Sequence, residues 1–512
     1  MYKLLLCLRY LKTRYIALVP IISVMLGVAT MIAVNGVMAG FTREMQDRIH
    51  GILSDIVLEV RNLEGAPDAE GHMQRIHKVA GDAIACMTPT VVVPAMLTFR
   101  YGENTITRQV ELIGIDEVSQ SRVSDYCRFL QHPENRRQMS FDLRDGGYDV
   151  RDHQAGPEAR DRPQMKAAGW QRRHNAAKAR SFKDSWDRSL GERPPAGASE
   201  PGDVPEDPFL IGNPAETARF DPATQQWTGL VMGIVLGSIR TPSGEDRFLV
   251  LPGDDVQLTF PTIGMRGLDV AITRDWFTVV DFYECKMSEY DARFVFVPIR
   301  ALQQARGMID PQSGVANFNA IQIKLKPGAN AEEIRDKLQG QFDAYDIVVQ
   351  TWRDKQGPLL AAVQMETAIL NVLLFLIIAV SGFGILAIFF MIVVEKTRDI
   401  GILKSLGASG AGVMGIFLGY GLSLGLVGSG VGLVLGLLFV RNINGIAAVL
   451  GKLTGRPVFD PAIYYFYKIP TLVDPWTVTS IMLGAVSIAV LASVLPAVRA
   501  ALLHPVEALR YE

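Results

Sequence analysis

The stretch at residues 393–409 reads VVEKTRDIGILKSLGAS and lies between two long apolar segments. It is charged and helix-forming, and it stands where the first of those segments would leave a lipid bilayer. Charge at such a point can orient a membrane span, and it can also offer a surface to a partner in the cytoplasm. This stretch is therefore the strongest clue to how the chain works.

The composition of the chain indicates a membrane protein. Hydrophobic residues make up 49% of the sequence, and the net charge of -2 argues against a nucleic-acid binder, which would carry a basic footprint. The apolar residues gather in four windows, each long enough for the ~20 residues that a bilayer span needs. The predicted transmembrane helices are 16–41, 366–394, 413–440 and 476–498.

The first apolar window has a basic start and a small residue near its end, as a signal peptide does. Its length exceeds the 7–15 apolar residues of a signal sequence, so an anchor is the better interpretation. Lys3, Arg9, Lys12 and Arg14 precede it, and the excess of basic residues predicts a cytoplasmic N-terminus. Residues 1–15 would form an amphipathic helix at the inner membrane surface, or simply extend the first span.

Four spans then define the topology. They place residues 42–365 outside the cytoplasm, 395–412 inside, 441–475 outside and the C-terminus at 499–512 inside. The fold class is therefore a membrane α-helical protein, with four transmembrane helices arranged one plus three. A large α+β extracytoplasmic domain would lie between the first and second helices.

Alternation and helical periodicity support an α+β external region. A helix or stalk is expected at 343–367, leading into the second span. Strands are predicted at 54–60, 91–100, 109–114, 231–238, 248–251, 256–260, 276–280, 293–297 and 321–325, and helices at 70–84, 298–307 and 331–342.

The external region is interrupted by a polar insertion at about 128–210. Residues 131–208 contain 14 Lys or Arg, 14 Asp or Glu, and only six Ile, Leu, Val or Met. So few apolar side chains cannot offset the entropy cost of ordering, which predicts a disordered or loosely ordered segment. Deleting it is expected to leave the rest folded.

The third span is rich in glycine, with eleven between Ser405 and Val440. Small residues four apart let helices approach closely in lipid, and internal packing and dimerisation explain the pattern equally well. The pairs are Gly415/Gly419, Gly421/Gly425, Gly428/Gly432 and Gly432/Gly436.

No catalytic motif is found in the sequence. It lacks a P-loop, HExxH and GxSxG, and its spans lack the ionisable residues that mark ion pathways. Cys86, Cys127 and Cys285 would be external, which allows at most one disulfide, and none has metal-ligand spacing. The protein is thus predicted not to be an enzyme, to bind no cofactor or metal, and to take its energy from another chain.

At this point the sequence resembles a known family. The one-plus-three spans, the segment EKTRDIGILKSLGAS at 395–409 and the ending LPAVRAALLHPVEALRYE at 495–512 resemble the FtsX/MacB-type ABC transporter permeases. These are type VII, mechanotransmission transporters. Val37–Gly51, Phe282–Pro298 and Met391–Gly407 look like the lipoprotein-releasing LolC/LolE branch. The insertion departs from the family pattern.

The resemblance implies that residues 366–512 form an FtsX-like permease domain and that 42–365 contain a MacB-like periplasmic core. The segment 395–412 would be the coupling helix, which docks on a separate ABC ATPase that binds the ATP. An apolar edge of Ile400, Leu403 and Leu406 could enter a groove on that ATPase. The alternative is that the segment acts only as a positive-inside signal that orients the neighbouring spans, which would need only Lys396, Arg398 and Lys404. The implied docking residues are Glu395, Lys396, Arg398, Asp399, Ile402, Lys404 and Leu406.

The resemblance also implies partners and a place in the cell. We expect an inner-membrane protein that pairs with a second permease copy or a paralogue, contacts membrane lipid, and handles a lipoprotein substrate, with a periplasmic chaperone as a further candidate partner. The alternatives are a MacB-like exporter of amphiphiles or peptides with an adaptor, and an FtsX-like signalling protein for a cell-wall hydrolase. Candidate substrate-contacting residues are Val37, Met38, Phe41, Phe375 and Phe383.

Overall fold

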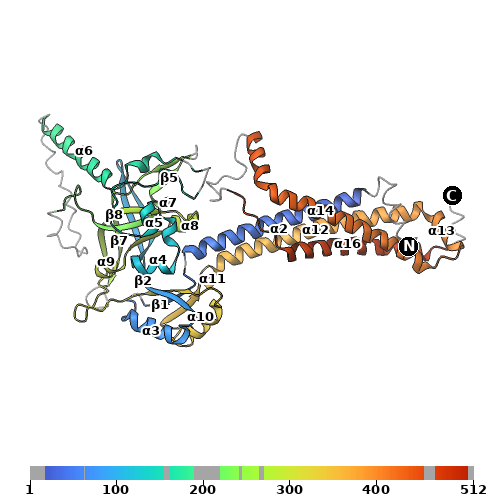
Figure 1. Ribbon diagram of the computed structural model, residues 1–512, viewed down its shortest axis with the longest axis horizontal. Coiled ribbons are helices and arrows are strands. Elements are labelled where there is room, and N and C mark those ends of the chain that lie inside the picture. Colours follow the sequence, from blue (N-terminus) through green and yellow to red (C-terminus); the bar gives the residue numbers. More distant parts are fainter. Residues whose placement is uncertain are drawn as a thin grey trace. The chain divides into compact units, whose positions relative to one another are not determined.

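The computed structural model divides the chain into two compact units (Figure 1). One is helical and takes in residues up to Gln46 and most residues after Pro358; the other is an α+β unit over Asp47–Gly357. The amphipathic helix predicted at 1–15 lies outside the described residues, as do 190–219 and the last eight residues. The structure describes residues 18–52, 54–62, 64–154, 159, 161–189, 220–241, 245–263, 270–454 and 468–504.

Among the described residues, four helices are long and apolar enough to cross a bilayer, as predicted. They extend beyond the predicted spans because charged and polar residues end an apolar run without ending a helix. In particular, the predicted loop at 441–475 begins as helix. The four are α2 (Leu18–Ile52), α12 (Gly357–Glu395), α14 (Gly410–Thr454) and α16 (Pro475–Leu502).

The glycines of α14 lie where this helix crosses two others. A Cβ at Gly421 would lie 2.5 Å from Oγ of Ser493 in α16, and one at Gly432 would lie 2.7 Å from the carbonyl oxygen of Met25 in α2. Gly425 meets α16 in the same way, and Gly428 and Gly436 meet α2. Packing inside the chain thus accounts for these glycines, one of the two explanations that the sequence left open.

The α+β unit begins and ends in a small antiparallel sheet with the order β11-β1-β10-β2. Two helices pack on it, so the chain order β-α-β-β-α-β and this strand order form a ferredoxin-like layer. Its core includes Ile56, Leu58, Ile76, Ile323 and Leu338. The elements are β1 (Ile56–Val60), α3 (Ala69–Ala80), β2 (Ile84–Tyr101), β10 (Ala320–Leu325), α10 (Ala331–Gln339) and β11 (Ile347–Thr351).

The second part of the unit is a closed barrel. The strand order β2-β3-β9-β4-β8-β7 returns to β2, because Met96, Leu97 and Thr98 of β2 also pair with β7. The long strand β2 therefore belongs to both the small sheet and the barrel. The other barrel strands are β3 (Asn104–Ile115), β4 (Thr228–Gly233), β7 (Asp255–Ile263), β8 (Val270–Tyr283) and β9 (Phe294–Pro298).

Short elements connect these strands. A two-stranded ribbon, β5 with β6, stands beside the barrel. The described elements not yet named are α4 (Glu117–Val123), η2 (Tyr126–Phe129), α5 (Pro133–Arg137), η4 (Pro163–Ala167), α6 (Trp170–Ser189), α7 (Ile234–Gly237), β5 (Ser238–Arg240), β6 (Asp246–Phe248), α8 (Ser288–Asp291), α9 (Ile299–Ala305), α11 (Trp352–Lys355) and α13 (Thr397–Ser405).

The insertion differs from its prediction of disorder wherever it is described. Leu130, Tyr148 and Met165 are buried, and the last two belong to the barrel core, so deleting the insertion would remove core side chains. Charged side chains are buried too, among them Asp152 and Arg162, and they pair with residues of the α+β unit outside the insertion. Composition counts apolar residues and cannot register pairing between charges, which is why it indicated disorder here.

Two further predictions are corrected by the structure. The segment 343–367 is not a continuous helix, because Ile347–Thr351 forms β11 at the edge of the small sheet, paired with β1. The strand predicted at 231–238 ends at Gly233, where a Cβ would lie 2.0 Å from the carbonyl oxygen of Asp291, and the chain turns into α7. Local alternation does not report these tertiary contacts.

Candidate functional site

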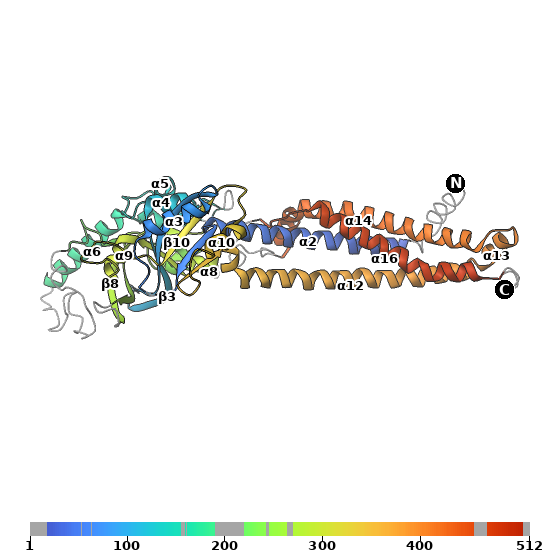
Figure 2. The same ribbon diagram turned by 90° about the horizontal axis from the view of Figure 1, so that it is seen from below.

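The charged stretch after α12 forms a separate short helix, α13, at one end of the helical unit (Figure 2). α12 ends at Glu395, and Lys396 leaves the helical backbone before α13 begins at Thr397. After α13, Gly407 has a φ of 94°, and the N–H of Ala408 donates to the carbonyl of Leu403. This left-handed cap suits glycine and turns the chain sharply into α14.

One face of α13 is packed into the helical unit. Thr397, Ile400 and Gly401 are buried, and Ile400 belongs to the core between the helices. The ammonium of Lys404 donates to the carbonyl oxygens of Ala501 (2.6 Å) and Leu503 (2.7 Å) at the end of α16. A cation there satisfies carbonyls that have no partner within the helix and complements the helix dipole.

The opposite face of α13 is exposed. Leu406 is 80% exposed and Ile402 is 43% exposed, and they stand four residues apart beside the exposed Arg398. Asp399 is also on the surface and pairs with Lys396 at 2.5 Å. We call Glu395, Arg398, Asp399, Ile402 and Leu406 the α13 stripe.

The stripe differs in part from the sequence prediction. The predicted apolar edge of Ile400, Leu403 and Leu406 is divided, because Ile400 is in the core and Leu403 is half-buried. Lys404, a predicted docking residue, is held against α16. The structure instead brings Ile402 and Leu406 together on the exposed face, where a partner can reach them.

A cavity of about 540 Å³ lies in the helical unit at the end of α12 opposite to α13. Its wall is mainly apolar and includes polar side chains such as Asn35, Gln364 and Asn371. Residues 472–474, just before α16, also line it. The helices α2, α12 and α16 thus line a partly open space that could hold part of an amphiphilic ligand.

The segment before α16, residues 468–474, crosses α2 at two glycines. We call it the strap. The N–H of Leu472 donates to the carbonyl of Gly36 at 2.9 Å, and a Cβ at Gly40 would lie 2.5 Å from the carbonyl of Pro470. Gly40 of the VNGVMAG sequence therefore has a physical role, which is to let the strap approach α2 closely, whereas a Cβ at Gly36 would come no nearer than 3.5 Å to its neighbours.

The five predicted substrate-contacting residues do not form one site. Met38 lines the cavity, while Val37 and Phe41 are half-buried on α2 and are not part of its lining. Phe375 and Phe383 lie on the exposed face of α12, and Phe383 is 70% exposed. Helix periodicity places these α12 residues on one side but cannot tell which side faces the neighbouring helices.

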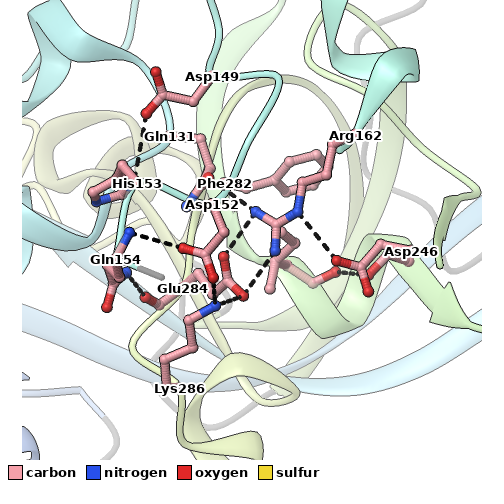
Figure 3. Close-up of polar contacts among 12 residues, drawn as sticks. Gln131, Asp149, Asp152, His153, Gln154, Arg162, Asp246, Phe282, Glu284 and Lys286 are labelled. Carbon is pink, nitrogen blue, oxygen red and sulfur yellow. Dashed lines mark hydrogen bonds and ion pairs between the residues drawn. The ribbon is translucent and has the colours of Figure 1, made fainter. Parts of the chain in front are cut away.

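A cluster of buried charges joins the insertion to the α+β unit (Figure 3). The guanidinium of Arg162 donates two bonds to the carboxylate of Glu284, at 2.8 and 2.9 Å, and its Nε donates to Asp246 at 3.1 Å. Lys286 donates to both Glu284 and Asp152. Arg240 contacts Asp246 from the other side at 2.8 Å.

Each charge in this cluster has a partner of opposite sign. Arg162 is 2% exposed at its side chain, and Glu284, Lys286 and Asp152 are also deeply buried. Burial alone would raise the pKa of Glu284, but Lys286 and Arg162 outweigh it and hold the pKa well below its ordinary value. Little in the sequence indicates this cluster, because its members are up to 134 residues apart.

The loop after β8 supplies Glu284 and Lys286 to this cluster, and its backbone is strained. Lys286 has a φ of 66°, an uncommon backbone conformation for a residue other than glycine. Asp291 holds the loop by accepting hydrogen bonds from the N–H groups of Cys285 (2.9 Å) and Lys286 (3.0 Å). Burial raises the pKa of Asp291 to about 7. Arg48, in the last turns of α2, donates to the carbonyl of Cys285 at 3.3 Å.

A second junction ties the end of α2 to the start of α11. The side-chain carboxylate of Asp55 accepts hydrogen bonds from His50 and from the backbone N–H of Leu325. The backbone carbonyl of Asp55 accepts a hydrogen bond from the N–H of Trp352 at 3.1 Å. The rings of His50 and Trp352 lie 5.6 Å apart. Asp55 therefore connects the chain entering the α+β unit with the chain leaving it.

The residues on either side of α13 also match a known family. Residues 371–505 match the family model described as FtsX-like permease C-terminal. The chain carries an FtsX-like permease domain. This domain contains most of α12, all of α13 and α14, and α16, so the α13 stripe lies within it.

Curated relatives are similar over part of the chain. It is 30% identical over 236 residues to the lipoprotein-releasing system transmembrane protein LolC of Xylella fastidiosa, covering 46% of this chain and 55% of the relative. It is 31% identical over 260 residues to LolC of Neisseria meningitidis serogroup B, covering 51% of this chain and 61% of the relative. It is 29% identical to the lipoprotein-releasing system transmembrane protein LolE of Haemophilus influenzae, covering 38% of this chain and 46% of the relative.

The chain therefore spans about half the length of the curated relatives it matches. Among the described residues, the four apolar helices and this similarity imply a multi-pass protein of the inner membrane.

Proposed function

We propose that this chain is the permease subunit of an ABC transporter of the lipoprotein-releasing type. A separate ATPase chain would bind and hydrolyse ATP, and this chain would bind no cofactor itself. α13 would lie in the cytoplasm with both termini, and the α+β unit would lie in the periplasm. The exposed α13 stripe inside the FtsX-like permease domain is the observation that carries this proposal.

The chemistry of the stripe suits docking on another protein. Ile402 and Leu406 can enter an apolar groove, while Arg398 and Asp399 at its edge set the register through charge. Exposed apolar side chains beside charges on a cytoplasmic turn have no lipid to cover them. A partner chain would remove them from water.

The packed face of α13 suits the transmission of motion. Ile400 in the core and the Lys404 ammonium on the end of α16 fasten α13 to the other helices. A displacement of α13 by the ATPase would therefore move α12, α14 and α16 with it, instead of bending a loose loop. Motion would reach the cavity at the other end of α12.

The cavity is the proposed entry point for a lipoprotein. Burial of acyl chain is worth ~0.8 kcal/mol per CH₂, so the chains of a lipid anchor must pass between apolar surfaces. Met38 lines that cavity, and the exposed face of α12 around Phe375 and Phe383 could be covered by lipid or by a second permease, whether a copy or a paralogue. A periplasmic chaperone would receive the released lipoprotein.

Co-purification with the ATPase tests the docking surface. Arg398→Glu and Leu406→Ser alter the exposed stripe without touching the packed face, and both should reduce recovery of the ATPase while membrane insertion is retained. Arg300→Glu, an exposed residue of the α+β unit, makes the same charge change as the control. Undiminished recovery of the ATPase with both stripe variants would refute the docking assignment.

Depletion of the chain tests the substrate class. Lipoproteins fractionated between inner and outer membranes should accumulate in the inner membrane. The chain is also 27% identical over 227 residues to the uncharacterized ABC transporter permease YknZ of Bacillus subtilis, covering 44% of this chain and 51% of the relative, and a broader class of exported substrate is the alternative. An unchanged distribution of lipoproteins would favour export of an amphiphile or peptide with an adaptor, or FtsX-like signalling to a cell-wall hydrolase.

A further inference from the structure

The last turns of α14 carry an exposed apolar stripe of their own. We call residues 441–454 the α14 extension. Ile446, Val449, Leu450 and Leu453 are all exposed, and Leu453 is 78% exposed. Their spacing of three and four residues puts them on one face of the helix. Four large apolar side chains on one face need a cover other than water.

The length of α14 excludes a simple span. Its 45 residues extend about 68 Å at 1.5 Å per residue, whereas the hydrocarbon core of a bilayer is about 30 Å thick. The extension therefore lies beyond the part of α14 that a bilayer can cover. Figure 1 shows its last turns leaning away from α2, α12 and α16.

The extension is chemically continuous with the lipid-facing part of α14. Leu435 and Phe439 are exposed on the span, and Ile446 follows them on the same face of the helix. Arg441 and Lys452 stand away from this face and are exposed. An apolar face with basic residues beside it is the pattern of a helix that lies in the interface of a membrane.

We propose that the α14 extension lies in the headgroup region of the bilayer, with its apolar stripe against the acyl chains and Arg441 and Lys452 at the lipid phosphates. Phospholipid is favoured over a protein partner because the stripe continues the lipid-facing side of a span. Asn442 is the one polar side chain on that face between Leu435 and Leu453, and its amide donates to the carbonyl of Leu438. Lipid binding by the extension goes beyond the proposed transport function and does not depend on it.

The interfacial position has a consequence for the strap. The side-chain amide of Asn444 forms two hydrogen bonds with the backbone of Ile469. It donates to the carbonyl of Ile469 at 3.3 Å and accepts from the N–H of Ile469 at 2.8 Å. The strap then crosses α2 at Gly36 and its last residues line the cavity. The bilayer surface would therefore fix one end of the segment that borders the cavity.

Nitroxide accessibility in vesicles tests the proposal. Single cysteines replace Val449, Leu450 or Leu453 on the stripe, or Ala448 on the other face as the control, in a background without Cys7, Cys86 and Cys127. Cys285 is fully buried and is kept. The vesicles contain phosphatidylcholine and phosphatidylglycerol, and each label is probed with oxygen, which partitions into lipid, and with a water-soluble nickel chelate.

The stripe positions should be accessible to oxygen and protected from nickel, and the label at Ala448 should show the reverse. In the Val449→Glu and Leu453→Glu double variant, the label at Leu450 should become accessible to nickel. High nickel accessibility at all positions would place the extension in water and overturn the proposal. Protection of the stripe from both reagents would mean a protein cover, such as a second copy, and would also overturn it.

Discussion

The substitution Arg162→Met tests whether the buried charge cluster holds the insertion in place. Methionine keeps an unbranched side chain but leaves Glu284 and Asp246 each with one cation fewer. Removing one partner from a buried ion pair costs about 3–5 kcal/mol. Here Lys286 and Arg240 remain, so the cluster is left with one buried negative charge in excess. For an α+β unit of roughly 300 residues, with an unfolding entropy of about 2.1 cal/mol/K per residue, this corresponds to a fall of about 5–8 °C in the unfolding midpoint.

The assay is thermal unfolding of the full-length protein in detergent, followed by tryptophan fluorescence. The signal reports mainly on the α+β unit, which holds Trp227, Trp276 and Trp352. Arg151→Met is the matched control, because the pair of Arg151 with Asp161 is 65% and 70% exposed at its side chains. Water screens such a pair, so its loss should leave the midpoint unchanged.

An Arg162→Met protein that unfolds at the wild-type midpoint would contradict this reasoning. It would mean that the cluster is not buried in the folded protein and that the insertion is loosely ordered, as its composition indicates. A similar fall in both variants would mean that the effect is one of surface charge and not of burial.

Three further predictions concern other parts of the chain. Gly432→Ala should lower the unfolding midpoint in detergent, at a cost of about 1–3 kcal/mol for overpacking against Met25, whereas Gly430→Ala, which has open space, should not. Because burial raises the pKa of Asp291 from 3.8 to about 7, the folded protein binds a proton that the unfolded chain releases. The stability contributed by this group therefore falls as the pH rises from about 4 to 7, and Asp291→Asn should lack that fall when midpoints are measured against pH. Lys404→Ala should loosen α13 and speed its amide hydrogen exchange without changing exchange in α10, and unchanged exchange in α13 would argue against its anchoring role.

The long elements could be predicted from the sequence because their signals are local. Charge-free windows located the four apolar helices, and alternation located strands such as β1 and β10. The disordered interpretation of the insertion was wrong where the structure describes it, because Arg162 and Glu284, which are 122 residues apart, stabilise each other only after folding. Likewise, the resemblance named the residues of α13, but only packing shows that Ile400 and Lys404 face inward while Ile402 and Leu406 face outward.

The small sheet also limits how far apart the chain can enter and leave the α+β unit. β1 follows α2, β11 precedes α11 and α12, and these two strands are hydrogen-bonded neighbours about 4.8 Å apart. Asp55 and the ion pair between Lys355 and Glu59 add cross-links at the same place. The chain therefore enters and leaves the α+β unit at two neighbouring, cross-linked strands. A force that pulled Ile56 and Thr351 apart would therefore have to break the hydrogen bonds between β1 and β11.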